Sequence, residues 1–380
     1  MNVPLLDLRQ QYAPIREPIR QAIDEVCDAQ ALILGKVTET FERRLAEYCG
    51  TTYAIGLSSG TDALLAPLMV MDLQPGDEVI CPSFTFFATA GCIHRAGARP
   101  VFVDIEPDTF NLDPSRVAEA VTPRTRAIIP VHLFGQSADM EAINAIACDP
   151  RHGQEIRVIE DAAQAIGATR HGKKVCSLGW CGALSFYPTK NLGAFGDAGA
   201  VCCNDRELFE KLRLLRIHGS AHTYYHEVVG GNFRIDAIQS AVLNIKLDHL
   251  DGWHEGRRRN AAIYDEMLAD SPVVTPHIAE GNQSIYNQYV VRIPVDVAER
   301  DAVKQQLADR GVGSGVYYPL GLHQQKCFAY LGYREGDLPV TERTCREVLA
   351  LPIYPELSEQ QVRYAATQLR ELLGPHPSGR

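Results

Sequence analysis

The hydrophobic and polar positions of the chain alternate between helical and strand-like periodicity. Residues 38–49 predict a helix, because Phe41, Leu45 and Tyr48 fall on one face and Gly50 ends the pattern. Residues 15–29 predict another. From residue 50 on, short apolar runs alternate with helix-like segments. Strands are expected at 53–57, 78–81, 100–104, 126–132 and 156–160, and helices from about residue 61 and over 85–96. This alternation predicts an α/β fold with a mainly parallel sheet and helices on both of its faces.

The pattern changes in the last third of the chain. Strands at 183–186 and 198–203 and helical segments at 204–217 and 234–270 precede the change. After it come strands at 288–293 and 313–317 and helices at 299–310, 341–350 and 358–373. We therefore predict a large domain over residues 1–251 and a smaller C-terminal α+β domain over 252–380, bridged by a long helix. The N-terminal segment is a candidate to pack on the small domain.

Composition and charge narrow the class of protein. The 380 residues are 46% hydrophobic and 22% charged, as is usual for a globular protein, and the net charge of −10 argues against a nucleic-acid partner. The basic run Arg257-Arg258-Arg259 is interpreted as a solvated helix face rather than a phosphate site. No apolar run is long enough for a membrane span, and no signal peptide is visible. The 11 cysteines lack disulfide or zinc spacing, so we expect free thiols, no metal and a cytoplasmic location.

Two residues at predicted strand ends carry the candidate chemistry. Asp161 closes the apolar strand at 156–160, and Lys190 lies shortly after the strand at 183–186. A carboxylate at the carboxyl end of a strand faces the crevice where α/β sheets bind ligands. An amine and a carboxylate so placed are what a pyridoxal phosphate (PLP) enzyme needs, the lysine for a Schiff base and the aspartate for the pyridinium nitrogen. Taken alone, Asp161 is equally compatible with a helix N-cap.

Two further segments run from a strand end into a helix. In Ser-Ser-Gly-Thr-Asp at 58–62, Gly60 permits close backbone approach and Thr61 adds a hydroxyl at a helix N-terminus, where a phosphate binds well. The alternative is an ordinary N-cap. Phe86, after the strand at 78–81, offers a face for a flat cofactor ring, or else belongs to the core.

Four motifs together resemble the DegT/DnrJ/StrS family of PLP-dependent nucleotide-sugar aminotransferases. They are Ser-Gly-Thr-Asp-Ala-Leu at 59–64, Glu-Asp-Ala-Ala-Gln at 160–164, Ser-Phe-Tyr-Pro-Thr-Lys-Asn-Leu-Gly at 185–193 and Gly-Asn-Phe-Arg-Ile-Asp at 231–236. The similarity covers essentially the whole chain. It implies PLP fold type I, that is, a mainly parallel sheet of the seven-stranded type with helices on both faces and a smaller C-terminal domain.

The resemblance also implies roles at the cofactor. Lys190 would hold PLP as the Schiff base, Asp161 would pair with the pyridine nitrogen, and Gln164 would lie near the phenolic oxygen. Phe86 stands at the position of the family's stacking aromatic. The phosphate cup would be formed by Gly60, Thr61, Asp62 and Ser185, and by Asn232 of the neighbouring chain in a homodimer with shared active sites. The alternative is that Asn232 is a turn residue that satisfies its own backbone.

On the substrate side, the resemblance points to Tyr187, Arg234 and His323. Gly321 departs from the family, which often has proline there. The implied reaction is transamination of a keto nucleotide-sugar, with L-glutamate as donor. The Asn191–Gly199 segment favours 3-keto over 4-keto sugars. Other PLP chemistry (a dehydratase or an aromatic amino-acid synthase) and a regulatory protein that has lost catalysis are the alternatives; the presence of Lys190 opposes the dehydratase and the regulatory protein.

Overall fold

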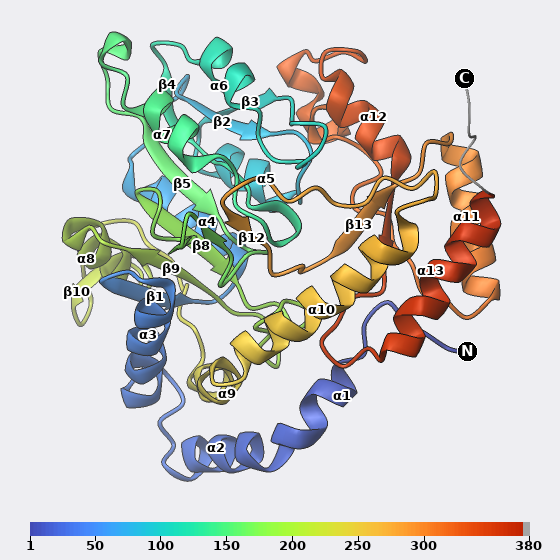
Figure 1. Ribbon diagram of the computed structural model, residues 1–380. Coiled ribbons are helices and arrows are strands. Elements are labelled where there is room, and N and C mark those ends of the chain that lie inside the picture. The colour runs from blue at the N-terminus through green and yellow to red at the C-terminus, as the bar shows by residue number, and fades with distance from the viewer. Residues whose placement is uncertain (375–380) are drawn as a thin grey trace.

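The computed structural model of the protein describes residues 1–374, and its centre is a seven-stranded sheet (Figure 1). The strand order is β1-β9-β8-β5-β4-β2-β3. The bounds are Tyr53–Leu57 (β1), Glu78–Pro82 (β2), Arg99–Val103 (β3), Thr125–Ile128 (β4), Arg157–Asp161 (β5), Cys181–Ser185 (β8) and Gly199–Cys203 (β9). Strand β9 runs in the opposite direction to the other six strands, which are mutually parallel. The predicted α/β fold with a mainly parallel sheet is confirmed.

Alternation along each strand sends side chains to two apolar layers. Val201 and Cys203 of β9 pack in one cluster, whereas Ala200 and Cys202 pack in the other. The first cluster is covered by α4 (Gly60–Val70), α5 (Ala88–Arg95) and α8 (Arg206–Leu215). The opposite face carries α3 (Lys36–Cys49), α6 (Pro114–Ala120), α7 (Met140–Ala147) and α9 (Ala237–Leu247). Because both faces of the sheet are covered, most of the strand side chains are apolar and buried.

The C-terminal third builds a further apolar cluster around a two-stranded antiparallel sheet of β13 (Tyr289–Arg292) and β14 (Val348–Leu351). Helices α10 (Leu250–Leu268), α11 (Val297–Asp309) and α13 (Glu359–Leu373) pack on it, and α12 (Pro339–Glu347) precedes β14. Val3 is fully buried in this cluster, and its backbone bonds to Gly311 and Gly313. Figure 1 accordingly shows the N-terminus beside α13. The helices α1 (Leu8–Tyr12) and α2 (Arg16–Asp28) lead from there to α3.

Smaller elements connect these layers. A three-stranded sheet is formed by β6 (Thr169–Arg170), β7 (Lys173–Lys174) and β12 (Asn282–Gln283). A hairpin of β10 (Ser220–His222) and β11 (Tyr225–His226) projects after α8. Tyr224 and Tyr225 of this hairpin are strongly exposed, as is Val229 shortly after it.

Three expectations for the C-terminal half are corrected. Residues 313–317 form no strand and make only a single bridge, between Gly315 and Ala350. Residues 348–351 are the strand that pairs with β13, although we expected a helix over 341–350. The long helix expected over 234–270 is divided into α9 and α10 at residues 248–249. In short apolar runs the helical and the strand pattern look alike in the sequence, and the packing of neighbouring elements determines which of the two forms.

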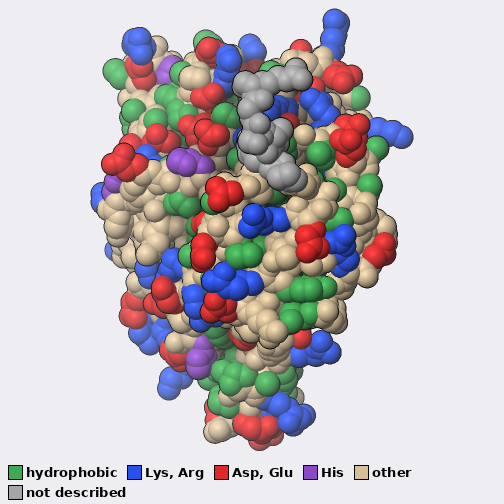
Figure 2. Space-filling model, turned by 45° about the vertical axis from the view of Figure 1, so that its right-hand side comes forward, with side chains coloured by type: hydrophobic (Ala, Val, Ile, Leu, Met, Phe, Trp, Pro, Cys, Tyr) green, Lys and Arg blue, Asp and Glu red, His purple; other side chains and the backbone are tan. Residues whose placement is uncertain are grey.

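The expectation of a solvated arginine face is wrong for one of its three members. Arg257 is only 3% exposed, because α10 packs between the main sheet and the C-terminal cluster (Figure 1). Arg258 and Arg259 keep partial contact with water. On the face shown in Figure 2, basic and acidic side chains are interspersed. Within residues 1–374, no helix is both long and apolar enough to cross a bilayer.

Candidate active site

The predicted site residues gather at one edge of the sheet. Strands β1, β2, β5 and β8 run parallel, so their carboxyl ends lie at the same edge, and β9 starts there opposite Ser185. Gly60 follows β1, Phe86 follows β2, Asp161 ends β5 and Ser185 ends β8. Lys190 lies five residues beyond Ser185. It is in a turn, where its own backbone N–H donates to the carbonyl of Tyr187 (2.8 Å). The segments that carry the cofactor motifs are therefore neighbours.

Asp161 is a buried carboxylate with few partners. It is 3% exposed, and it accepts hydrogen bonds from the Thr89 hydroxyl (2.8 Å) and the Ala163 N–H (3.2 Å). Burial raises the pKa of Asp161, and these two donors and the charge of Lys190 oppose that rise. A carboxylate can accept about four hydrogen bonds. Asp161 thus has capacity left for a cationic or N–H partner.

The preceding residue, Glu160, is satisfied in full. Its carboxylate accepts from His132 Nε2 (2.8 Å) and from the backbone N–H groups of residues 176, 178 and 179 (2.7–2.8 Å). The backbone N–H of Ala138 donates to His132 Nδ1 (3.1 Å), so the His132 tautomer that fits carries its proton on Nε2. The two carboxylates point to opposite faces of the sheet because side chains alternate along a strand. Glu160 therefore links β5, the strand that carries Asp161, to His132 and to the backbone of residues 176–179.

Lys190 is half-buried, and burial lowers its pKa to about 8. The negative charge of Asp161 acts in the opposite direction and raises it. An amine with this pKa is partly unprotonated near neutral pH, whereas an ordinary lysine is not. Such an amine can attack a carbonyl group and can carry a proton to and from a substrate carbon.

The N-terminus of α4 lies against Ser185, where the sequence predicts a phosphate cup. A Cβ on Gly60 would lie 2.5 Å from the Ser185 Cβ, so only glycine permits this approach. Gly199 is equally tight, because a Cβ there would lie 2.3 Å from the Ser59 carbonyl oxygen. In residues 1–374, the N–H groups of Gly60 and Thr61 have no protein acceptor, as is usual in the first turn of a helix. They are available to an anion.

Asp62 is used differently from the other cup residues. Its carboxylate accepts from the hydroxyls of Ser58 (2.6 Å) and Ser59 (2.9 Å), and its N–H donates to Ser59 Oγ (3.0 Å). These contacts cap α4. The side chain of Asp62 supports the helix terminus and presents no donor of its own to a phosphate.

An exposed aromatic ring lies beside the site. Phe86 is 60% exposed, although large apolar side chains are usually buried, and its ring centre is 6.5 Å from that of Tyr318. Gln164 connects the same region, because its Oε1 accepts from the Phe134 N–H (2.9 Å) and its Nε2 donates to the Tyr318 hydroxyl (3.1 Å). The structure therefore places Phe86 as an apolar surface at the edge of the sheet.

The remaining candidates differ in their accessibility. Tyr187 and Asn232 are exposed, and Arg234 is half-buried beside Leu57 at the end of β1, with an Nε atom that has no partner in residues 1–374. His323 is buried at 3% exposure, where Nδ1 contacts the Ser83 hydroxyl (2.6 Å) and Nε2 contacts Glu342 (3.2 Å). Both ring nitrogens of His323 are occupied by protein groups in this chain.

Two residues of the site escaped the sequence analysis. Thr89 on α5 donates to Asp161, and Tyr318 contacts Gln164 and flanks Phe86. Thr89 lies four residues after Thr85, a spacing that would place both on one face of the helix expected over 85–96. In the structure the two hydroxyls are 3.2 Å apart, although α5 begins only at Ala88. The spacing in the sequence was the one available signal. Nothing in the sequence indicated that the face turns toward Asp161.

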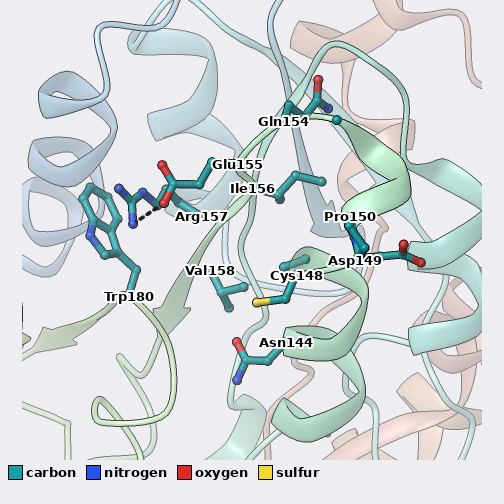
Figure 3. A pocket seen from close by; sticks show the side chains of 12 residues that line it. Asn144, Cys148, Asp149, Pro150, Gln154, Glu155, Ile156, Arg157, Val158 and Trp180 are labelled. Atoms are coloured by element: carbon teal, nitrogen blue, oxygen red, sulfur yellow. Dashed lines mark ion pairs between the residues drawn. The ribbon is translucent and has the colours of Figure 1, made fainter.

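A separate pocket lies at the other end of β5. It has a volume of about 690 Å³ and lies beside Asn144, Cys148, Arg157 and Trp180, with the guanidinium of Arg157 paired to Glu155 (2.8 Å) and 4.8 Å from the Trp180 ring centre (Figure 3). Arg157 begins the strand that Asp161 ends, so the two are separated by about 13 Å along it. The pocket contains none of the predicted site residues.

Comparison with known proteins decides the family. The DegT/DnrJ/EryC1/StrS aminotransferase family matches residues 14–370. The chain belongs to this family. The predicted membership, the PLP fold type I architecture and the assignment as an aminotransferase are thereby confirmed.

Three relatives show how far the similarity extends. A "pleiotropic regulatory protein" from Geobacillus stearothermophilus is 50% identical over 374 residues, which are 98% of each chain. A UDP-N-acetyl-3-dehydro-alpha-D-glucosamine 3-aminotransferase from Acidithiobacillus ferrooxidans is 43% identical over 98% of each chain. The crystal structure of Streptomyces venezuelae DesV in complex with a ketimine intermediate has a TM-score of 0.93 at 42% identity, covering 97% of this chain and 98% of that one.

The lowered pKa of Lys190 predicts how cofactor uptake depends on pH. In the cofactor-free protein, the rate of covalent PLP attachment should rise through a midpoint near pH 8 and then level off, because the neutral amine is the reactive form. In Asp161→Asn the midpoint should move to lower pH, since the charge that raises the pKa of Lys190 is gone. Stopped-flow absorbance measures both rates. An unmoved midpoint in Asp161→Asn would show that the two side chains do not interact.

The close approach of α4 to β8 predicts a glycine requirement. Gly60→Ala should weaken PLP binding about tenfold or more, because the new Cβ pushes the helix N-terminus away from Ser185. Gly252→Ala is the matched control: it lies in helix α10 with open space around its Cβ position, and it should leave PLP affinity unchanged. Titration of the cofactor-free proteins with PLP measures the difference. Equal affinities of the two variants would contradict the proposed cup.

Proposed function

We propose that the protein transfers an amino group from L-glutamate to the 3-keto group of a nucleotide-linked sugar, with PLP as its cofactor. The observation that carries the proposal is the pair of Lys190 and Asp161 at one edge of the sheet. The lysine has a pKa of about 8, and the buried carboxylate has unused hydrogen-bonding capacity. Family membership supports the reaction class.

The residues at this edge fit the chemical groups of PLP. A protonated ring nitrogen is the partner that the desolvated carboxylate of Asp161 lacks. The exposed face of Phe86 suits a flat ring, and the free N–H groups of Gly60 and Thr61 with the hydroxyl of Ser185 suit a phosphate. Gln164 lies near enough to Tyr318 for both to border the same ring. When bound, PLP supplies an electron sink for the carbon that loses its proton.

Lys190 would then move the proton at the reacting carbon. The neutral Nζ takes the proton from the α-carbon of the amino donor, and the protonated Nζ later gives one to the sugar carbon that receives nitrogen. A pKa of about 8 suits both directions, because neither the neutral nor the charged amine is strongly disfavoured near neutral pH. Tyr187, Arg234 and His323 remain proposed substrate residues. Because His323 is buried and bonded to Ser83 and Glu342, it would affect the substrate only by positioning the loop that carries it.

Amination at carbon 3 has support from the sequence and from a relative. The Asn191–Gly199 segment resembles members that act on 3-keto sugars, and the name of the Acidithiobacillus ferrooxidans relative states a 3-dehydro sugar and a 3-amino transfer. A 4-keto sugar is the alternative within the same reaction. The test is to incubate the purified protein with L-glutamate and paired 3-keto and 4-keto nucleotide sugars and to identify amino sugars by mass spectrometry. Exclusive conversion of the 4-keto series would contradict the proposed position.

A regulatory role without catalysis is the second candidate, because a relative with 50% identity is named a regulatory protein. The presence of both Lys190 and Asp161 in the site opposes it. A regulator that no longer transfers amino groups has no need for an amine with a lowered pKa beside a buried carboxylate.

Lys190→Ala should abolish both the covalent link to PLP and turnover. Borohydride reduction of the holoenzyme followed by peptide mass spectrometry should find the cofactor on Lys190 alone, because Lys190 is the amine at the carboxyl edge. Lys246→Ala is an informative control: burial lowers the pKa of Lys246 to about 8 as well, but its Nζ donates to the Gly193 carbonyl (2.6 Å). A cofactor trapped on Lys246 or elsewhere would overturn the assignment.

We further propose a homodimer with shared sites. Asn232 is exposed, without a side-chain partner in residues 1–374, and the nearby hairpin exposes Tyr224, Tyr225 and Val229. Contiguous exposed apolar side chains often mark a protein contact. In a two-fold dimer, each chain would lend Asn232 to the other's phosphate cup.

Mixing two inactive variants tests the shared site. Mixed dimers of Lys190→Ala and Asn232→Ala chains should regain activity above either parent, because both lesions fall in one site and leave the other intact. Activity after co-refolding, with heterodimers verified by differently tagged chains, is the measurement. Heterodimers as inactive as their parents, given a real defect in Asn232→Ala alone, would contradict sharing.

A further inference from the structure

A cavity of about 330 Å³ adjoins Lys190 on the side of the C-terminal cluster. The segments around it come from distant parts of the chain: the N-terminus, the Lys190 turn, α10, the start of β13 and the end of β14. It is lined by Leu5, Leu6, Thr189, Lys190, Arg257, Asn287, Gln288, Tyr317, Ala350, Leu351 and Ile353. Two of these side chains are cationic and none is acidic. The cavity therefore suits an anion.

Arg257 is the buried cation of this cavity. It is 3% exposed, and its Nη1 donates to the carbonyls of Tyr286 (3.0 Å), Asn287 (3.2 Å) and Ile353 (2.9 Å). These bonds fix the guanidinium but do not neutralise it. Its Nε has no hydrogen-bond partner in residues 1–374. The charge of Glu356 acts on Arg257 and raises its pKa, but the two side chains form no ion pair among the described residues. Burial lowers the pKa of Arg257 to about 10, so it stays charged at neutral pH.

Two amides beside Arg257 are also incomplete. Asn287 Oδ1 and Gln288 Oε1 are buried and have no hydrogen-bond partner in the described chain. Asn287 as a whole is 9% exposed. An amide can turn its NH₂ group toward an anion by a half rotation of the side chain. A buried guanidinium with an unpartnered Nε and buried amides with unmade hydrogen bonds are costly unless a ligand completes those bonds.

We infer that this cavity binds the α-carboxylate of the amino donor, held by the guanidinium of Arg257 with Asn287 and Gln288. This inference rests on the proposed transamination. In an α-amino acid the carboxylate is bonded to the carbon whose proton Lys190 removes. An anion site for it must therefore adjoin Lys190, as this cavity does. The volume lies at the low end for small-molecule pockets, about 300–1,000 Å³, which suits an amino acid better than a nucleotide-linked sugar.

Separate half-reactions test the assignment. The PLP holoenzyme is mixed with L-glutamate, and the enzyme preloaded with pyridoxamine phosphate is mixed with the keto sugar; both are followed by absorbance. Arg257→Lys should raise the apparent Kd for L-glutamate about 30-fold or more, because a planar two-donor edge is replaced by a point charge. It should change the keto-sugar half-reaction less than threefold. Binding of 2-oxoglutarate, measured by calorimetry, should weaken in parallel.

Two further variants complete the test. Gln288→Leu leaves the three carbonyl bonds of Arg257 intact and should raise the Kd for L-glutamate three- to tenfold, which keeps the inference testable even if Arg257→Lys folds poorly. Arg258→Gln is the matched control: its guanidinium pairs with Glu255 at the surface, and it should leave both half-reactions unchanged. With 4-aminobutyrate, an amine that lacks an α-carboxylate, Arg257→Lys should have no effect.

The outcomes separate this inference from the proposed function. A wild-type enzyme that reacts with the keto sugar but not with L-glutamate contradicts the proposed donor and, with it, this subsite. A normal wild type with unaffected Arg257→Lys and Gln288→Leu variants contradicts the subsite alone. Loss confined to the keto-sugar half-reaction would assign the cavity to an anionic group of the sugar nucleotide and would also overturn the inference.

Discussion

Two neighbouring carboxylates at the end of β5 impose the main constraint on this structure. Glu160 receives four donors and is fully satisfied within the chain, whereas Asp161 receives two and is almost as deeply buried. Burying a carboxylate costs several kcal/mol unless charge or hydrogen bonds compensate. The hydrogen bonds within the chain offset this cost for Glu160, whereas Asp161 keeps unused hydrogen-bonding capacity. The site is thus prepared for a cationic partner before any ligand arrives.

The other site residues follow from the same edge of the sheet. Because the parallel strands end together, the helix N-terminus at Gly60, the aromatic face of Phe86 and the amine of Lys190 lie at the same edge of the sheet as Asp161 without long loops. The C-terminal cluster supplies Arg257 from the opposite side, on a helix that also contributes Tyr264 and Leu268 to that cluster's core. The sheet therefore holds Asp161 and the core of the C-terminal cluster holds the helix of Arg257, while Lys190 is placed by the turn after β8.

Sequence reasoning recovered what depends on local pattern. The strand at 53–57 was predicted at its observed bounds, and Lys190 and Asp161 were placed at strand ends by their motifs. What it missed depends on packing. Thr89 and Tyr318 reach the site only because α5 and the segment after residue 313 fold over it. Arg257 was assigned to solvent from its charged neighbours, but α10 has partners on two sides, which a run of charges does not reveal.

The strand order also determines when the cup can exist during synthesis. Gly60 meets Ser185, and Ser59 meets Gly199, only after β9 has been inserted between β1 and β8. The two pairs of partners are 125 and 140 residues apart, a length that a ribosome adding about 5–20 residues per second covers in roughly 6–28 s. Until then β1 has no neighbour in the sheet, because its one strand partner is β9. For that interval the nascent chain carries β1 with both of its edges unpaired, whereas the finished sheet leaves only the outer edge of β1 without a strand. The interval is therefore a liability for aggregation and a natural point for chaperone contact.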